Sequence, residues 1–496
     1  MSYLGLDIGT SGCKAVVYSS DGLALKSAFR EYTLIHPLAA YAELDSAWVI
    51  NSCYDVIREV NANLTDAVVA MCISSQGEAF TAVGENGHIL CNAMVSSDSR
   101  AEQEVLSFTS TFGKEKIYQI TGHTPHSIFT LFKLLWLKNN RIEIWNEARY
   151  FLCFEDLFIY TLGLNPAISW PLAGRTMLFD VKKHQWSSEI LNAIGLDENK
   201  LAIPVASGQV SAIIPKKIAE TLGFQNEVII VAGGHDQTVG ALGAGVTESG
   251  ECMYATGTVE CFCPVFDNLT LESPLMQNNL CCYDYTILGK YATVAYSLTG
   301  GNILKWFRDE FGQIEKQKAA QNGTDVYSEL LSHMPEEPSK LLTLPYFSPT
   351  GTPYFDSFTH GAILGLQLTT SRYEILKSLL EGVALEMRLN LELMEQSGMQ
   401  VNCFIATGGG ARNSAWVQLK ADVLNRPVKV TNRNETGCYG AAMIAMSGVE
   451  EIDITAIIKR NQGELKVYEP VDKRAAIYTE KFIKYRNLYA CIKSFN

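Results

Sequence analysis

The sequence of 496 residues lacks any apolar run of the length that crosses a bilayer, which is about 20 residues. We also expect no leader with a charged segment and an apolar core, because Met1 is followed at once by strand-like sequence. We therefore expect a cytoplasmic protein that has no membrane partner.

The chain has little positive charge. Its 40 Lys and Arg residues face 53 Asp and Glu residues, so the formal net charge is -13, and the basic residues form no cluster. An acidic surface repels nucleic acid and anionic lipid, so we expect no nucleic acid as partner and predict small-molecule ligands. The 13 cysteines are odd in number and scattered, which is typical of reduced thiols. Composition and charge do not determine the oligomeric state, and a homodimer is compatible with both.

A Walker-type loop, G-x-x-x-x-G-K-[ST], is absent, which excludes this loop as a phosphate cradle. Low-complexity linkers are absent as well. The length exceeds that of one ordinary core, because domains rarely exceed about 300 residues. We therefore predict two lobes, residues 1–245 and 246–496, which meet within Leu242 to Gly250, where LGAGVTESG separates two strand-like segments.

Short apolar runs alternate with longer segments in which apolar residues recur every three or four positions, a pattern that predicts a layered α/β fold. The expected strands include Tyr3 to Ile8, Val68 to Ile73, Val228 to Val231 and Cys403 to Ala406. The expected helices include Trp48 to Val60, Thr130 to Asn139, Tyr373 to Met394 and Ala415 to Leu424.

The first motif runs from Leu6 to Lys14 and has the design strand, glycine turn, strand. Its turn of small residues allows backbone N–H groups to approach phosphate oxygens, and Thr10 and Ser11 add hydroxyl donors. Asp7 beside phosphates requires an intervening Mg²⁺, and Lys14 would neutralise part of a triphosphate. An ordinary β-hairpin is an equally good interpretation of this segment taken alone.

A second hairpin, Met253 to Phe262, repeats this design at the start of the second half. Its turn contains Thr256, Gly257 and Thr258. The alternative of a plain hairpin applies here too, but a pair at matching positions is much harder to ascribe to chance. We therefore predict that the two lobes hold one triphosphate between them.

The segment Gly233-Gly234-His235-Asp236-Gln237 follows an expected strand, so its glycines place a carboxylate at the C-terminal edge of a sheet, where α/β sheets bind ligands. Asp236 there could accept the proton of a sugar hydroxyl, while Gln237 holds a neighbouring hydroxyl. The alternative is an Asp that caps a helix from Gln237 to Leu242. We expect His235 to be a structural neighbour.

The fourth motif, Ile405 to Asn413, leads from a strand through three glycines into a helix. Such a turn admits a purine or ribose against the backbone, although a plain strand-to-helix turn has the same pattern.

These four motifs, in this order, resemble the FGGY family of carbohydrate kinases. Two further segments are similar to the family's signatures. Gly361 to Leu366, followed after seven residues by Glu374 to Glu381, resembles the C-terminal signature, and Thr130 to Asn140 resembles the N-terminal one, with Ile128 the one departure. The likeness spans about residues 3 to 448.

The resemblance implies two ribonuclease-H-like lobes of the actin and hexokinase type around a central cleft, with ATP and Mg²⁺ as ligands besides the sugar. It implies that Asp236 is the catalytic base and Asp7 the carboxylate near magnesium. The ATP site that it implies, together with the turn residues above, comprises Thr10, Ser11, Lys14, Thr256, Gly257, Gly301, Gly409 and Asn413. The implied sugar contacts are Gln76, Glu78, Asp98 and Gln237.

Departures from the family pattern concern the substrate. Members that phosphorylate glycerol carry Arg-Glu at Gly77-Glu78 and Trp at Ser96, so we expect a glycerol site to lack a guanidinium and a stacking wall here. Xylulose kinases usually carry Met-His at the first place. We predict a ketose substrate, most simply a pentulose. A polyol or aldonic acid kinase, an actin- or chaperone-like ATPase and a catalytically silent sugar sensor are the alternatives.

Overall fold

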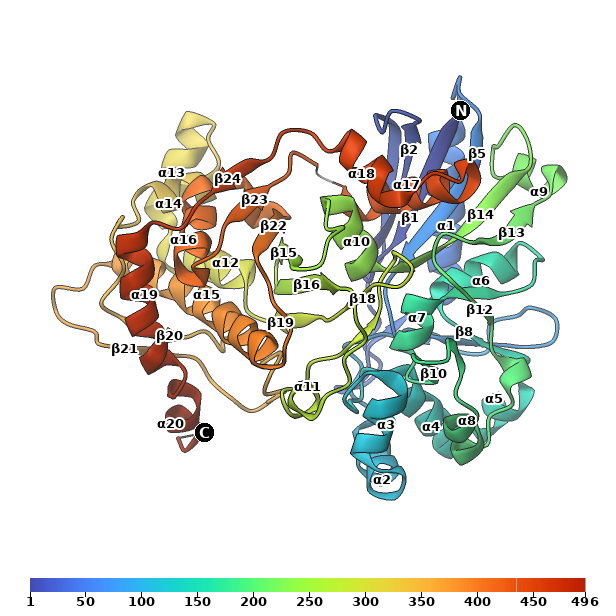
Figure 1. Ribbon diagram of the computed structural model, residues 1–496, viewed down its shortest axis with the longest axis horizontal. Helices are drawn as coiled ribbons and strands as arrows, with labels where there is room; N and C mark the ends of the chain where they lie inside the picture. The colour runs from blue at the N-terminus through green and yellow to red at the C-terminus, as the bar shows by residue number, and fades with distance from the viewer. Residues whose placement is uncertain (434, 496) are drawn as a thin grey trace.

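The computed structural model describes residues 1–433 and 435–495 and contains two large β-sheets (Figure 1). The first sheet has the strand order β13-β14-β5-β1-β2-β3, in which β1, β5 and β14 run parallel. Its strands are β1 (Ser2–Ile8), β2 (Gly12–Ser19), β3 (Ala24–Glu31), β5 (Val68–Ser75), β13 (Val210–Ile214) and β14 (Val228–His235).

The second sheet repeats the design of the first, because an antiparallel hairpin, β15–β16, is followed by parallel strands β22 and β23. The predicted internal similarity, a hairpin that opens each sheet, is thus confirmed. The strands are β15 (Glu251–Thr256), β16 (Glu260–Phe266), β17 (Tyr283–Asp284), β18 (Tyr291–Ala292), β19 (Ala295–Ser297), β22 (Cys403–Thr407), β23 (Val428–Val430) and β24 (Lys466–Tyr468).

The predicted strands and helices are confirmed, with boundaries that shift by a few residues. The helix predicted from Tyr373 begins at Arg372, because Ser371 and Glu374 form a capping box. Strand β14 continues to His235, since Gly234 and His235 pair with the end of β5. The helices predicted by periodicity are α1 (Ser46–Asn61), α4 (Thr130–Asn140), α15 (Arg372–Gln396) and α16 (Ser414–Leu424).

Further helices lie in both halves of the chain. In the first half these are α2 (Glu102–Phe112), α3 (Lys114–Thr121), α5 (Ile142–Glu147), α6 (Phe154–Thr161), α7 (Trp170–Arg175), α8 (Ser188–Ile194), α9 (Lys216–Thr221) and α10 (Asp236–Ala244). In the second half they are α11 (Ser273–Gln277), α12 (Gly301–Phe311), α13 (Gln313–Asn322), α14 (Val326–Ser332), α17 (Thr436–Glu450), α18 (Ile454–Asn461), α19 (Asp472–Tyr485) and α20 (Leu488–Lys493).

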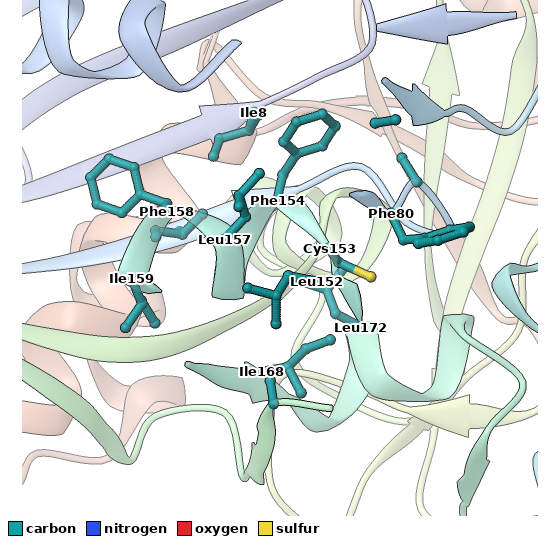
Figure 2. Close-up of a cluster of buried hydrophobic side chains, with 14 of the residues drawn as sticks. Ile8, Phe80, Leu152, Cys153, Phe154, Leu157, Phe158, Ile159, Ile168 and Leu172 are labelled. Carbon is teal, nitrogen blue, oxygen red and sulfur yellow. The ribbon is translucent and has the colours of Figure 1, made fainter. Parts of the chain in front are cut away.

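Part of the core of the first half lies around α6, whose apolar side chains pack with the end of β1 and with α7 (Figure 2). Phe154, Leu157 and Phe158 of α6 are each at most 1% exposed. This packing fixes α6 and α7 beside the C-terminal edge of the sheet, and both helices contribute to the candidate site.

Helices α10 and α17 cross between the sheets, and α17 packs against β1 and β5 although it belongs to the second half of the sequence (Figure 1). Glycines permit this close crossing. A Cβ at Gly440 would lie 2.2 Å from the Val239 carbonyl oxygen, and one at Gly243 would lie 1.9 Å from that of Thr436. A hydrophobic cluster at the crossing draws residues from both halves.

Among the described residues, no helix combines the length and the apolar character needed to cross a membrane. The four clustered cysteines of the second half, Cys261, Cys263, Cys281 and Cys282, are buried.

Candidate active site

Asp236 lies where β14 ends and α10 begins. The helix-capping alternative is not what the structure shows, because His235 occupies the cap position and Asp236 is the first helical residue. The Asp236 side chain is 30% exposed, and its Oδ1 accepts a hydrogen bond from Gln237 Nε2 at 3.2 Å. The Gln237 Oε1 is buried and has no hydrogen-bond partner among the described residues.

The electrostatic environment of Asp236 favours its protonated form. Burial, followed by the negative charges of Asp7 and Glu78, raises the pKa of Asp236 to about 7. His235 Nε2 lies 3.2 Å from Asp236 Oδ1, while its Nδ1 lies 2.8 Å from the Tyr283 hydroxyl. Burial, with Arg175 nearby, holds the pKa of His235 well below its usual range, so this imidazole is neutral. A carboxylate with a pKa near neutrality is suited to general-base catalysis.

An arginine that no motif indicated lies beside this turn. Arg175, the last residue of α7, donates from Nε to Glu78 Oε1 at 2.6 Å. Its guanidinium lies between two rings, with its carbon 5.0 Å from the centroid of Phe129 and 5.6 Å from that of Tyr283. We expected a glycerol site to lack a guanidinium here because residue 77 is glycine, and this stays a prediction. A Cβ at Gly77 would lie 3.2 Å from Arg175 Cβ, so α7 brings a different arginine close to this position, paired with Glu78.

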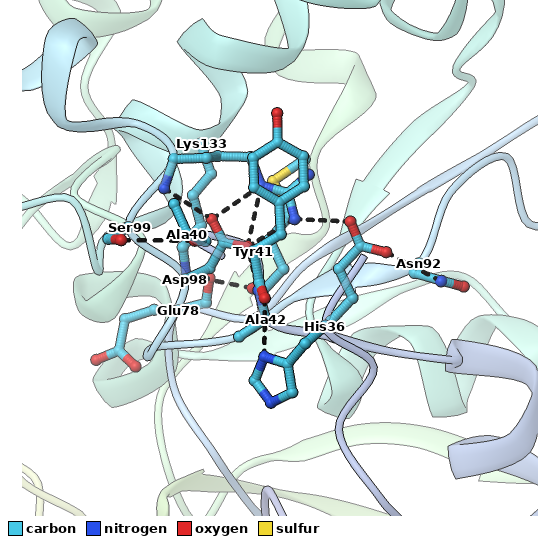
Figure 3. Close-up of polar contacts among 12 residues, drawn as sticks. His36, Ala40, Tyr41, Ala42, Glu78, Asn92, Asp98, Ser99 and Lys133 are labelled. Atoms are coloured by element: carbon cyan, nitrogen blue, oxygen red, sulfur yellow. Dashed lines mark hydrogen bonds and ion pairs between the residues drawn. The ribbon is translucent and has the colours of Figure 1, made fainter. Parts of the chain in front are cut away.

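Asp98, predicted to contact the sugar, is fully engaged in protein contacts (Figure 3). Its Oδ2 accepts from Ala42 N at 2.8 Å, and both of its oxygens accept from Arg100. Arg100 in turn lies 3.6 Å from the centroid of the Tyr41 ring. Asp98 thus fastens the loop around residues 40–42, and its contact with the sugar stays a prediction.

Lys133, in the N-terminal signature, is also buried in this region (Figure 3). Its Nζ donates to the carbonyl oxygens of Glu78 and Met94, at 3.3 and 3.2 Å. Burial lowers the pKa of Lys133 to about 8. The amine therefore fixes the backbone at Glu78, which orients the Glu78 carboxylate toward Arg175.

The hairpin turn after β1 is held by Gln76. Thr10 Oγ1 donates to Gln76 Oε1 at 3.1 Å, and Gln76 Nε2 donates to the Gly9 carbonyl at 2.9 Å. Asp7 Oδ1 accepts from Ser74 Oγ at 2.7 Å. Both ends of the Gln76 amide therefore serve the predicted phosphate turn, and its predicted sugar contact stays a prediction.

The two remaining residues of this hairpin lie nearer to solvent. Ser11 is exposed, and Lys14 forms an ion pair with Glu435 at 2.6 Å. A phosphate would compete with Glu435 for Lys14, so the predicted roles of both residues remain predictions.

Five residues predicted for ATP line one cavity of about 820 Å³ in the second half. They are Thr256, Gly257, Gly301, Gly409 and Asn413. Its wall also includes Tyr327 and Trp416, which no motif had indicated. The cavity lies within the range of ligand pockets, roughly 300–1,000 Å³.

The cavity residues differ in what they can offer a ligand. Thr256 Oγ1 is buried and donates to the Thr407 carbonyl at 2.7 Å, whereas Thr258 in the same turn is exposed and lines the cavity. These contacts favour Thr258 as the hydroxyl donor. Asn413 Oδ1 caps α16 by accepting from Trp416 N at 3.1 Å.

Gly301 opens α12 against the turn of the second hairpin, where its N–H donates to the Gly257 carbonyl at 2.8 Å. A helix N-terminus at a glycine turn is suited to bind phosphate.

We expect Gly301→Ala to raise the KM for ATP about tenfold or more, because its Cβ would lie 2.6 Å from the Gly257 carbonyl oxygen. Initial-rate kinetics at varied ATP measures this. Gly463→Ala is the control, since no atom lies within 4 Å of that Cβ. Equal KM values for Gly301→Ala and wild type would contradict the prediction.

Comparison with known proteins assigns both halves of the chain to one family. The profile of the FGGY family of carbohydrate kinases, N-terminal domain, matches residues 2–243, and that of the C-terminal domain matches residues 253–449. Xylulose kinase from Staphylococcus xylosus is 25% identical over 99% of this chain and 100% of its own length. Gluconokinase from Bacillus subtilis (strain 168) is 24% identical over 96% and 93%.

Solved structures agree on the fold. The crystal structure of ligand-bound xylulose kinase from Lactobacillus acidophilus covers 100% of both chains with a TM-score of 0.89 at 22% identity. The two sheets and their crossing helices therefore form the two-lobed fold of these kinases, of the actin and hexokinase type.

Proposed function

Because the chain belongs to the FGGY family of carbohydrate kinases, and is thus an ATP-dependent phosphotransferase that acts on a hydroxyl group, we propose that it phosphorylates a pentulose such as xylulose. The observation that carries the proposal is Asp236, a carboxylate with a pKa near 7 beside the Arg175–Glu78 pair. Relatives named xylulose kinase, which align along the whole chain, support the choice of sugar.

In the proposed reaction, Asp236 accepts the proton of the attacking hydroxyl as the oxygen bonds to the γ-phosphorus of ATP, and ADP leaves. Glu78 and Gln237 contact the sugar, and the Gln237 Oε1, which has no partner among the described residues, is available to a second hydroxyl. Asp98, whose oxygens accept from Ala42 and Arg100, holds the loop around residues 40–42. The turns after β1 and β15 contribute backbone N–H groups and the hydroxyls of Thr10 and Thr258 to the phosphates. Neutral His235 fills the space behind the base.

A magnesium ion fits two carboxylates of the first lobe, Asp7 and Asp236. The charge of Asp7 raises the pKa of Asp236, so two carboxylates face one region in which no described lysine or arginine forms an ion pair with either. Burial also raises the pKa of Asp7. Asp7 would hold Mg²⁺ through water, and the ion would neutralise charge on the phosphates when bound.

The acidic groups of the site support a ketose over an aldonic acid. Asp7, Glu78 and Asp236 are three acidic groups against the one guanidinium of Arg175, and burial holds the pKa of His123 and His235 well below the usual range, so neither imidazole adds a positive charge. A substrate carboxylate would enter a region with an excess of negative charge. A neutral sugar is therefore favoured over an aldonate, although the gluconokinases are relatives of similar identity.

The proposal is tested by ADP formation from Mg-ATP with a panel of ketoses, polyols and aldonates. We expect kcat/KM for the best pentulose to exceed that for glycerol by about a hundredfold or more, because Ser96 offers no stacking wall. Turnover with gluconate alone would replace the pentulose by an aldonate. ATP hydrolysis that no sugar stimulates would reject the kinase assignment.

We expect the activity to depend on pH through Asp236. The base must be ionised, and its pKa is raised to about 7, so kcat/KM should fall tenfold per pH unit as the pH drops below about 7. An unperturbed aspartate would place this fall near pH 4. Rates between pH 5 and 9 at constant ionic strength measure the profile. An acid limb at or below about pH 5 would contradict the assigned environment of Asp236.

The lobe boundary is part of the proposal. We place it within Leu242 to Gly250, between α10 and β15, so that residues 1–245 and 246–496 form the lobes. The first family match ends at residue 243 and the second begins at residue 253, which supports this boundary. Helix α17 then extends from the second lobe onto the sheet of the first.

A further inference from the structure

Glu155, in the first turn of α6, is a buried carboxylate that belongs to none of the motifs. It is 2% exposed, and α6 also carries Phe154, Leu157, Phe158 and Ile159, apolar side chains of the first core (Figure 2). Burial raises the pKa of Glu155 to about 7. Because the burial of a carboxylate costs free energy, its hydrogen-bond partners must compensate strongly.

Three donors converge on the two carboxylate oxygens. Glu155 Oε1 accepts from Gly233 N at 2.9 Å, and Oε2 accepts from both N and Oγ of Ser169 at 2.7 Å. Gly233 lies near the end of β14, three residues before Asp236. Ser169 is the residue before α7, the helix that ends in Arg175. One side chain therefore binds the backbones that carry the base and the guanidinium.

The Gly233 peptide has no strand partner that could replace Glu155. The pairing of β14 with β5 is interrupted between Val231 and Gly234. On its other sides the peptide is confined, because Ser207 Oγ donates to the Gly233 carbonyl at 2.6 Å and a Cβ at Gly233 would lie 1.8 Å from the Ile73 carbonyl oxygen. Glu155 thus supplies the acceptor that the sheet lacks at this point.

We propose that Glu155 is a positioning residue, which couples the turn of Asp236 to helix α7 and so fixes the base relative to the Arg175–Glu78 pair. The inference rests on the proposed function, because it assigns Asp236 as the base. A displacement of about 1 Å at a reacting group can cost about a hundredfold in rate, so a rigid link of this kind has a kinetic consequence.

Glu155→Gln tests the coupling, because the amide keeps the shape but turns an N–H group toward a donor. We expect kcat with the best sugar to fall about 10- to 100-fold while the KM for Mg-ATP stays unchanged. Hydrogen exchange of the amides in residues 228–240 should accelerate. Ser169→Ala, which removes the hydroxyl donor and leaves two backbone bonds to Glu155, should lower kcat by about tenfold or less. If Glu155→Gln does not fold, Ser169→Ala tests the same link through a smaller change.

Asp156→Asn is the matched control, because Asp156 is the next residue of α6 and is 1% exposed. In the described part of the chain, its carboxyl makes no hydrogen bond to Gly233 or Ser169. We expect it to change Tm without changing kcat or the exchange of residues 228–240. If Glu155→Gln lowers Tm but keeps wild-type kcat and exchange, Glu155 is only structural and the inference is overturned. If the wild type phosphorylates no sugar, the proposed function is rejected, and unchanged exchange in Glu155→Gln would still reject the link.

Discussion

Asp236→Asn is expected to lower kcat for the sugar by about a hundred- to ten-thousand-fold, because an amide of the same shape cannot accept the proton. The affinity for ATP should stay nearly unchanged, since the described ATP cavity does not include Asp236. Stability should not fall. Asp7 and Glu78 disfavour the charge at residue 236, so its removal should keep or raise Tm.

Steady-state kinetics, nucleotide titration and thermal unfolding measure the three quantities on one preparation. Asp309→Asn is the control, since Asp309 is a carboxylate of α12 paired with Arg308 and Lys316 outside the candidate site. Retention of more than about a tenth of wild-type kcat in Asp236→Asn would remove the base role from this residue.

The second large effect is expected from Arg175→Met. The Arg175 and Glu78 side chains are 10% and 5% exposed, so the change leaves a carboxylate without its partner. Removal of one member of a buried ion pair costs about 3–5 kcal/mol in the free energy of unfolding. Loss of the orientation of Glu78 should also lower kcat/KM for the sugar by about a hundredfold, while kcat/KM for ATP in uncoupled hydrolysis changes little.

The double variant Glu78→Gln with Arg175→Met separates the two contributions. It removes the orphaned charge, so we expect it to regain much of the stability but none of the activity. Arg58→Met is the control, because the Arg58–Asp55 pair is about half exposed and should contribute about 1 kcal/mol or less. A double variant no more stable than Arg175→Met would show that the ion pair is not the source of the loss.

Much of the fold was predictable because its signals are local. Strands β1, β5, β14 and β22 are short apolar runs. Glycine or serine residues lie at or near the end of each strand, where they permit a tight turn. The internal repeat of two hairpins predicted two similar sheets. The crossing of α17 onto the first sheet was not predictable, since it depends on the close contact of glycines such as Gly243 and Gly440 that are far apart in the chain.

The candidate site likewise contains residues that the sequence could predict and residues that it could not. Residues in glycine-rich turns, such as Gly257 and Gly409, were found by motif and line one cavity. Arg175 was missed because its short helix has no motif and its partner Glu78 lies 97 residues away in the sequence. For Asp98, the sequence could not show that both oxygens are occupied by protein donors, because Ala42 approaches from another loop.

The placement of α17 on the first sheet constrains how the chain is made. Cys438 of α17 contacts Lys14 of β2, 424 residues earlier in the sequence, and a Cβ at Gly5 would lie 1.8 Å from the Cys438 carbonyl oxygen. During synthesis, the first sheet therefore emerges from the ribosome long before the helix that covers it. Contacts of such high sequence separation slow folding, and the uncovered strands are prone to aggregation in the interval. We expect residues 1–245, expressed alone, to need a chaperone or the missing helix to remain in solution.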